Sequence, residues 1–145
     1  MHRNVLRLFA LIALAVTSSL AFAGSDTAYQ NTTILTIQIV QDIENKTYKL
    51  GIDDLDALPQ VAFETSTIWT EGVVAFSGPS LREVLESVDA KPKTIRAFAL
   101  NDYNMVIAMT ESDDTYPIVA TRMNGERFSV RDRGPLWLVY PYDSG

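Results

Sequence analysis

The sequence predicts an α+β domain that is mostly β, and three observations carry this prediction. Short runs of apolar residues with polar neighbours at alternate positions recur along the chain, as half-buried strands require. Two segments show a helical spacing of apolar residues, and both are short. The strand-like and helix-like segments do not alternate as the βαβ units of a parallel sheet do. We therefore expect hairpins packed against two short helices.

The first half of this domain is predicted to contain two strands, a helix and a third extended segment. Residues 34–40 place apolar side chains at near-alternate positions, and a second short strand follows at 46–50. Asp53 and Asp54 supply the acidic first turn of a short helix. Residues 61–69 are rich in threonine and aromatic residues, which favours a strand.

A second helix and a hairpin are predicted in the middle of the domain. Ser80 and Glu83 have the spacing of a capping box, and apolar residues follow on one helical face. Residues 94–100 and 105–109 are strand-like, and the turn-forming residues between them predict a hairpin.

The strongest hairpin signal of the chain is the Asn124-Gly125 dipeptide. It separates two strand-like runs, at 117–123 and 127–130. After a Gly-Pro break, residues 136–140 form an apolar segment that predicts the last strand.

Residues 1–23 are predicted to be a signal peptide. They begin with a short basic stretch, continue with an apolar run and end with the small-x-small cleavage pattern of residues 21–23. The apolar run is short beside the roughly 20 residues of a membrane span, so a retained N-terminal anchor is the less favoured alternative. We expect a periplasmic or secreted protein without membrane insertion after cleavage. Residues 24–33 are predicted to be a flexible lead-in, and 34–145 a single domain.

The predicted processed chain is acidic and lacks the side chains of several common chemistries. Residues 24–145 hold 10 basic and 18 acidic residues, a formal net charge of −8, which disfavours nucleic acid as a partner. The chain has no cysteine, and its one histidine is His2, inside the predicted signal peptide. Disulfides, thiolate metal ligands and histidine-activated nucleophiles are therefore excluded. We expect no catalytic residue and no metal ligand.

Seven short motifs follow one another along the predicted domain. They are Trp69-Thr70-Glu71-Gly72, Phe76-Ser77-Gly78, Leu81-Arg82-Glu83-Val84-Leu85, Ala99-Leu100-Asn101-Asp102-Tyr103, Asn124-Gly125, Arg131-Asp132-Arg133-Gly134-Pro135-Leu136-Trp137 and Tyr140-Pro141. In this order they resemble the oxidoreductase molybdopterin-binding domain, which has the sulfite-oxidase-like fold. The chain is most similar to that family's short exported bacterial members, often named as predicted oxidoreductases. The resemblance covers the chain from about residue 34 to its end.

The resemblance implies a molybdenum cofactor that this chain is poorly equipped to hold. The family's catalytic members bind molybdenum through a pterin dithiolene and one protein cysteine, a soft thiolate ligand. The resemblance places that ligand near Glu64-Thr65-Ser66-Thr67, where this chain offers hydroxyl groups. The loaded cofactor also requires export of a folded protein, whereas the predicted signal serves unfolded chains. We therefore expect no cofactor, with molybdopterin implied by the resemblance alone, and we favour a non-enzymatic role.

By the same resemblance, seven residues lie in segments that line or border the pterin cleft. They are Trp69, Asn101, Asp102, Tyr103, Arg122, Arg131 and Arg133. Arginine suits bidentate recognition of carboxylate or phosphate, and aromatic rings offer flat stacking walls. The alternative interpretation makes Trp69 and Tyr103 core or turn anchors, and makes Arg131-Asp132-Arg133 a charged loop.

Acidic clusters offer another chemistry, since two neighbouring carboxylates can act as acid and base. Asp53-Asp54-Asp56 and Asp113-Asp114 are such clusters. Their surroundings favour an acidic helix start and a solvated loop. The first cluster also lacks the glycine and the distal glutamate of an EF-hand calcium loop.

The sequence thus predicts a periplasmic, non-catalytic binding or interaction module on a molybdopterin-binding-domain scaffold. A small anionic ligand or a membrane signalling protein is the expected partner. A pterin- and molybdenum-dependent oxidoreductase with an unusual ligand set is one alternative. A defective remnant is the other, because the family usually continues past residue 143 with a further strand. The chain is therefore expected to be truncated, with a sheet edge left uncovered.

Overall fold

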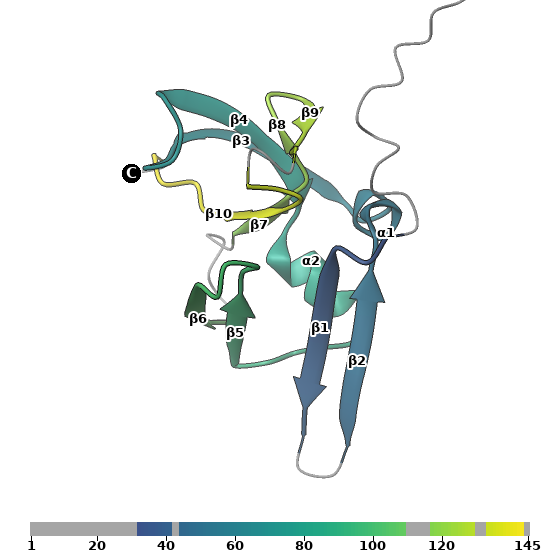
Figure 1. Ribbon diagram of the computed structural model, residues 1–145. Coiled ribbons are helices and arrows are strands. Elements are labelled where there is room, and N and C mark those ends of the chain that lie inside the picture. The colour runs from purple at the N-terminus through teal and green to yellow at the C-terminus, as the bar shows by residue number, and fades with distance from the viewer. Residues whose placement is uncertain (1–31, 42–43, 110–116, 130–132, 144–145) are drawn as a thin grey trace, which may run out of the picture.

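The computed structural model describes residues 32–41, 44–109, 117–129 and 133–143. Over these ranges it is mostly β, with ten strands and two short helices, which confirms the predicted α+β, mostly β class. The strands are β1 (Leu35–Val40), β2 (Asn45–Leu50), β3 (Gln60–Ser66), β4 (Val73–Pro79), β5 (Thr94–Phe98), β6 (Asn104–Ala108), β7 (Ile118–Ala120), β8 (Arg122–Met123), β9 (Glu126–Arg127) and β10 (Trp137–Val139). The helices are α1 (Ile52–Asp56) and α2 (Leu81–Glu86) (Figure 1).

The strand pairs of this part of the chain are antiparallel, and most are hairpins. β3, β4, β8 and β9 form a four-stranded sheet in that order, while β1–β2, β5–β6 and β10–β7 form two-stranded sheets. Asn124 and Gly125 join β8 to β9, with φ angles of 52° and 82°. Positive φ at both positions suits a two-residue hairpin turn. The hairpin predicted at 94–109 is confirmed as well, and the strands predicted at 34–40 and 46–50 pair with each other.

Both helices begin where the sequence predicts. At α1, the backbone N–H of Gly51 donates to the Asp54 carboxylate over 2.7 Å, so the acidic first turn binds the backbone just ahead of the helix. At α2, the Ser80 hydroxyl accepts from the Glu83 N–H over 3.1 Å, which is one half of the predicted capping box. Within the described ranges, no helix is long and apolar enough to cross a membrane.

Strand β4 is not among the predicted strands, although it begins with the strand-forming residues Val73, Val74 and Phe76, and it lies between β3 and β8 in the four-stranded sheet. Its Gly78 belongs to a residue type that usually weakens a strand. Here a close approach requires glycine, because a Cβ atom at this position would overlap the backbone carbonyl of Val119 in β7. The strand predicted at 61–69 ends at Ser66 instead, so Trp69 lies in the turn that leads to β4.

The interior consists of two hydrophobic clusters. The first surrounds the buried side chains of α2 and includes partly buried residues of β1, β2, β5 and β6. In Figure 1, α2 lies between the β5–β6 hairpin and the upper end of the β1–β2 hairpin, and both hairpins contribute residues to its cluster. The second cluster is aromatic: Trp137 stacks on Phe76 and Phe128, with ring centroids 5.9 and 5.4 Å away. It joins the four-stranded sheet to the β10–β7 pair.

Candidate functional site

The turn between β3 and β4 presents an aromatic side chain to solvent. Thr67 organises this turn, because its hydroxyl accepts from the Trp69 N–H (3.1 Å) while its own N–H donates to the Thr70 hydroxyl (3.2 Å). Gly72 has a φ of 68°, a left-handed value that glycine adopts without strain. Trp69 is 64% exposed, so it is no part of the hydrophobic core.

A guanidinium group lies over this exposed ring. Cζ of Arg133 is 4.5 Å from the centroid of the Trp69 ring, which is within the range of a cation–π interaction. Arg133 is itself exposed, and no hydrogen bond or ion pair with another described residue engages its guanidinium. Two of the seven predicted cleft residues therefore meet on the surface, although they come from distant parts of the chain.

The strand that leads into this turn is tied to the C-terminal segment by Asp143. Its carboxylate accepts hydrogen bonds from the Ser66 N–H (2.5 Å), the Ser66 hydroxyl (2.9 Å) and the Thr65 hydroxyl (3.3 Å). The hydrogen bond from the Ser66 backbone, followed by that from its side chain, lowers the pKa of the Asp143 carboxyl below its ordinary value. No local sequence signal finds this contact, because its partners are 77 and 78 positions apart.

Ser66 lies where the family resemblance places the metal-binding cysteine, and its surroundings do not fit that cofactor. The donors at the end of β3 are the hydroxyls of Thr65 and Ser66 and the carboxylate of Asp143, all of them hard oxygen ligands. They are already hydrogen-bonded to one another. A soft thiolate, which the molybdenum group takes from protein, is missing from the sequence altogether.

Three further predicted cleft residues form the turn between β5 and β6. The Tyr103 N–H donates to the Asn101 side-chain oxygen over 3.3 Å, and Asp102 has a φ of 64°. All three residues are exposed, and Tyr103 is 65% exposed. No hydrogen bond, ion pair or ring contact among the described residues joins this turn to Trp69 or Arg133. The structure therefore makes Tyr103 a solvent-facing turn residue and leaves the two groups separate.

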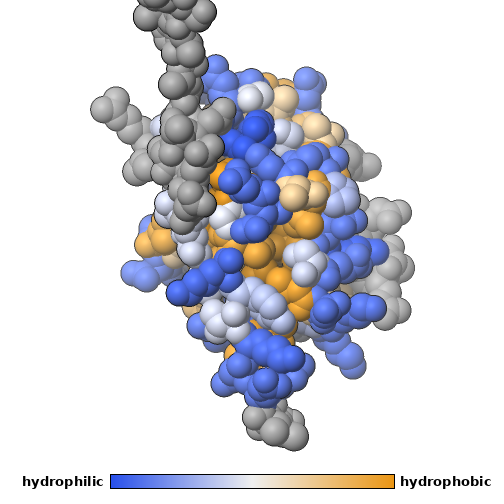
Figure 2. Space-filling model, turned by 90° about the vertical axis from the view of Figure 1, so that its right-hand side faces the viewer, coloured by the Kyte–Doolittle hydropathy of each residue, from blue (hydrophilic) through white to orange (hydrophobic). Residues whose placement is uncertain are grey.

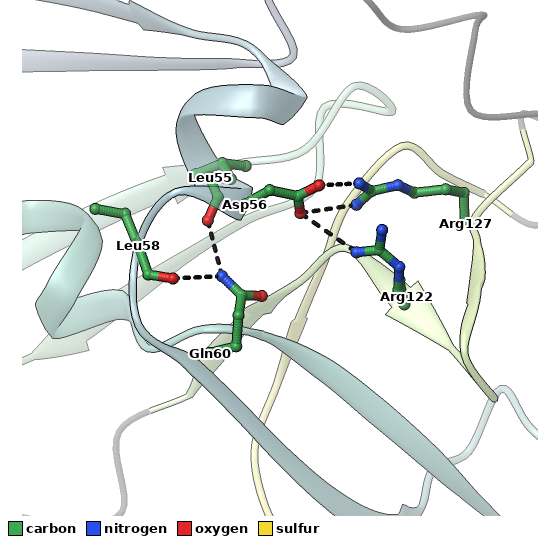
Figure 3. Close-up of polar contacts among 6 residues, drawn as sticks. All are labelled: Leu55, Asp56, Leu58, Gln60, Arg122 and Arg127. Carbon is green, nitrogen blue, oxygen red and sulfur yellow. Dashed lines mark hydrogen bonds and ion pairs between the residues drawn. The ribbon is translucent and has the colours of Figure 1, made fainter.

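Arg122 belongs to a different cluster, in which it shares one carboxylate with Arg127 (Figure 3). Asp56, the last residue of α1, accepts from Arg122 over 3.3 Å and from one Arg127 nitrogen over 3.1 Å, and it pairs with the second Arg127 nitrogen as well. The Gln60 amide donates to the carbonyl groups of Leu55 and Leu58 over 2.9 and 2.7 Å. The cluster thus clamps α1 to the β8–β9 hairpin.

The ion pairs decide the protonation of Asp56. Partial burial raises the pKa of Asp56, but the hydrogen bonds and charges of Arg127 and Arg122 outweigh this effect, and the net pKa lies below the ordinary value. Asp56 is therefore the ion-pair partner of two arginines, a role that the predicted acidic helix start did not include. Its partners are 66 and 71 positions away, so helix signals could not reveal them.

Arg122 is also well separated from the Trp69 turn along the sheet. Arg122 pairs with Ser77 of β4, and Ser66 pairs with Val73 at the other end of the same strand. Four strand residues span about 13 Å. Arg131, Asp132 and Asp113-Asp114 lie outside the described residues. Within the described part, no group of three or more acidic, histidine or cysteine side chains could hold a metal ion.

No protein-family model matches the chain, and no curated protein matches it. The likeness to the molybdopterin-binding domain therefore stays a prediction from the motifs.

Proposed function

We propose that the chain is an exported, periplasmic binding module of sulfite-oxidase-like fold that takes a small planar anion at Trp69 and Arg133. One observation carries the proposal. A 64% exposed indole and a guanidinium 4.5 Å from its centroid offer a stacking surface and a positive charge in one place. In a chain of formal net charge −6, this arginine is a solvent-facing cation without an acidic partner in the described structure.

The chemistry of the two side chains defines the ligand class. A guanidinium presents N–H donors in a planar fork that matches carboxylate or phosphate. The indole offers an apolar face on which a flat ring stacks. Hydrogen bonds of Thr67 already order the turn that carries Trp69, so binding costs little further backbone conformational entropy at that residue.

The end of β3 supports a binding role over a redox role. Ser66 and Asp143 are paired with each other by hydrogen bonds, and neither is a soft ligand. Metal analysis of protein purified from the periplasm tests this part of the proposal. Stoichiometric molybdenum would contradict it and would favour the oxidoreductase alternative.

The binding test uses pterin-6-carboxylate, a flat heteroaromatic anion, titrated into the protein by calorimetry. We expect saturable binding, and binding at least about tenfold weaker for pterin without the carboxylate, because the charged contact to Arg133 is lost. Trp69→Ala and Arg133→Gln should each weaken binding of the carboxylate by about tenfold. Arg133→Gln should also remove the preference for the charged ligand.

Two matched controls lie on the β5–β6 hairpin. Arg96→Gln removes an exposed arginine of β5, and Tyr103→Ala removes an exposed aromatic residue of the neighbouring turn. Neither should alter the affinity. The proposal is wrong if no saturable binding occurs, or if the control variants lose as much affinity as the Trp69 and Arg133 variants.

A further inference from the structure

We infer that the free edge of β1 pairs with β1 of a second copy of this chain, so that the protein forms a symmetric dimer. Among the described strands, β1 pairs with β2 and with no other. Figure 1 shows the β1–β2 hairpin extending away from the other sheets. Two-stranded sheets are marginally stable by themselves and gain from additional strands.

The two edges of this hairpin differ in the features that protect a sheet edge. β2 has the sequence Asn-Lys-Thr-Tyr-Lys-Leu, and both of its lysines are exposed. Lysine on an edge strand discourages pairing with another chain. β1 has the sequence Leu-Thr-Ile-Gln-Ile-Val, with no charge, no proline and no glycine. β1 is therefore suited to receive a further strand, whereas β2 is suited to face water.

The charge distribution of the hairpin permits a second copy to approach the β1 edge without repulsion. The chain has a formal net charge of −6, so two copies repel each other wherever their acidic side chains meet. β1 carries no charge, and the charged side chains of β2 are its two lysines. Approach through β1 therefore brings no carboxylates of the two strands together.

A two-fold contact also explains why assembly would stop at two copies. Antiparallel pairing of β1 with β1 satisfies both free edges at once and yields a four-stranded sheet. The outer edges of that sheet are the lysine-bearing β2 strands, which resist further addition.

The apolar surface of the hairpin fits this arrangement. Leu35, Ile37 and Ile39 share one face of β1 and are only partly buried against the cluster around α2. Figure 2 shows apolar surface between polar side chains on the side of the molecule where the hairpin lies. On the other face, Thr36 and Gln38 are exposed, and a two-fold axis would bring these positions of both copies close together.

The primary experiment measures the mass of the processed chain in solution at about 100 µM by light scattering after gel filtration. We expect the dimer mass, both in dilute buffer and at about 1 M salt, because the contact is uncharged. The double variant Thr36→Glu with Gln38→Glu places four carboxylates near the two-fold axis. We expect the dimer Kd to rise at least about tenfold. A monomeric wild-type chain at this concentration would overturn the inference.

The matched control adds the same charge to the other strand of the hairpin. Asn45→Glu with Thr47→Glu changes the β2 residues that pair with Val40 and Gln38, and the dimer should persist. Equal loss of dimer in both double variants would refute a contact through the β1 edge.

Hydrogen exchange in the wild type keeps the inference testable if the variants fold poorly. Protection of the β1 amides should fall on dilution, while protection of β5 and β6 stays constant. Protection of β1 that does not depend on concentration would refute the inference. The outcome is independent of ligand binding at Trp69, which lies on another hairpin.

Discussion

Arg122 and Arg133 are both predicted to border one cleft, but the fold gives them different surroundings. The Arg122 side chain is 33% exposed and shares Asp56 with Arg127, whose side chain is 8% exposed. Arg133 lies on the surface over the exposed ring of Trp69. The charge of Arg122 is neutralised within the fold, whereas that of Arg133 faces solvent. An arginine is free to bind an anion only where the fold has not already paired its charge.

Removal of the Asp56 carboxylate, which Arg122 and Arg127 share, should have the largest effect on the stability of the protein. Asp56→Ala takes the carboxylate from two guanidinium groups, one of them nearly buried, and should lower the free energy of unfolding by about 2 kcal/mol near neutral pH. Urea unfolding of the wild type and the variant measures this difference in the free energy of unfolding. Asp53→Asn in the same helix is the control, since Asp53 is exposed, and its effect should stay within about 0.5 kcal/mol.

The pH dependence of the Asp56 effect has a definite sign. The folded state lowers the pKa of Asp56, so its contribution to stability is complete above the ordinary carboxyl pKa of 3.8 and is lost as the pH falls through the lower folded value. The difference between the wild type and Asp56→Ala should therefore shrink in acid. A difference that grows below this pH would show that Asp56 does not stabilise the fold as a carboxylate.

Removal of the buried hydroxyl of Thr121, next to Arg122 in the chain, should change stability less and in the opposite direction. Thr121 is fully buried, and its hydroxyl has no hydrogen-bond partner among the described residues. Thr121→Val keeps the shape and removes the cost of burying that group, so stability should increase by about 1 kcal/mol. A higher midpoint of thermal unfolding in the variant than in the wild type would show this increase. A loss of stability would mean that the hydroxyl has a partner in the folded protein.

Substitution of Arg133, the arginine that faces solvent, should barely change the free energy of unfolding. Arg133→Gln removes one exposed cation–π contact, which contributes about 0.5 kcal/mol. The same variant should lose the affinity for a planar anion described above, so binding and folding separate at this residue. If urea unfolding shows a loss as large as that of Asp56→Ala, Arg133 is a structural residue like Arg122.

The smallest effect on stability should come from Asp143, whose carboxylate binds the end of β3 through Ser66 and Thr65. Asp143→Asn weakens the acceptor of the Ser66 and Thr65 hydrogen bonds. Because the pKa of Asp143 is lowered in the folded state, its contribution is present above the ordinary carboxyl pKa and disappears as the pH falls through the folded value. Unfolding midpoints of wild type and variant should differ slightly at neutral pH and coincide in strong acid. An equal difference between the two midpoints at both pH values would contradict a stabilising role of the Asp143 charge.

Local signals account for the parts of the fold that were predictable. The acidic start of α1, the Ser80 cap of α2 and the Asn124-Gly125 turn depend on residues within three or four positions of one another. Their backbone chemistry is the same in any fold. Strand β4 has strand-forming residues at 73–76, but the need for its Gly78 depends on a neighbour 41 positions along the chain, the backbone of Val119, and no local pattern reveals that contact.

The candidate site was predictable only in its chemical types. Trp69 and Arg133 have side chains suited to a planar anion, and the resemblance predicts both as cleft residues. The same set includes Arg122, Asn101, Asp102 and Tyr103, which the structure places elsewhere. Composition and spacing could not separate these residues, because their exposure depends on contacts between distant segments.

The mostly β class, the caps and turns, and the lack of cysteine and histidine in the predicted domain can all be read from the amino-acid sequence. These follow from side chains and from interactions over a few residues. Long-range packing gave Arg122 a carboxylate partner and placed Arg133 over an exposed ring, and it joined Ser66 to Asp143 and Asp56 to Arg127. Such contacts depend on burial and on long-range packing, because the same type of side chain is neutralised where a carboxylate lies beside it and faces solvent where an exposed ring lies beneath it.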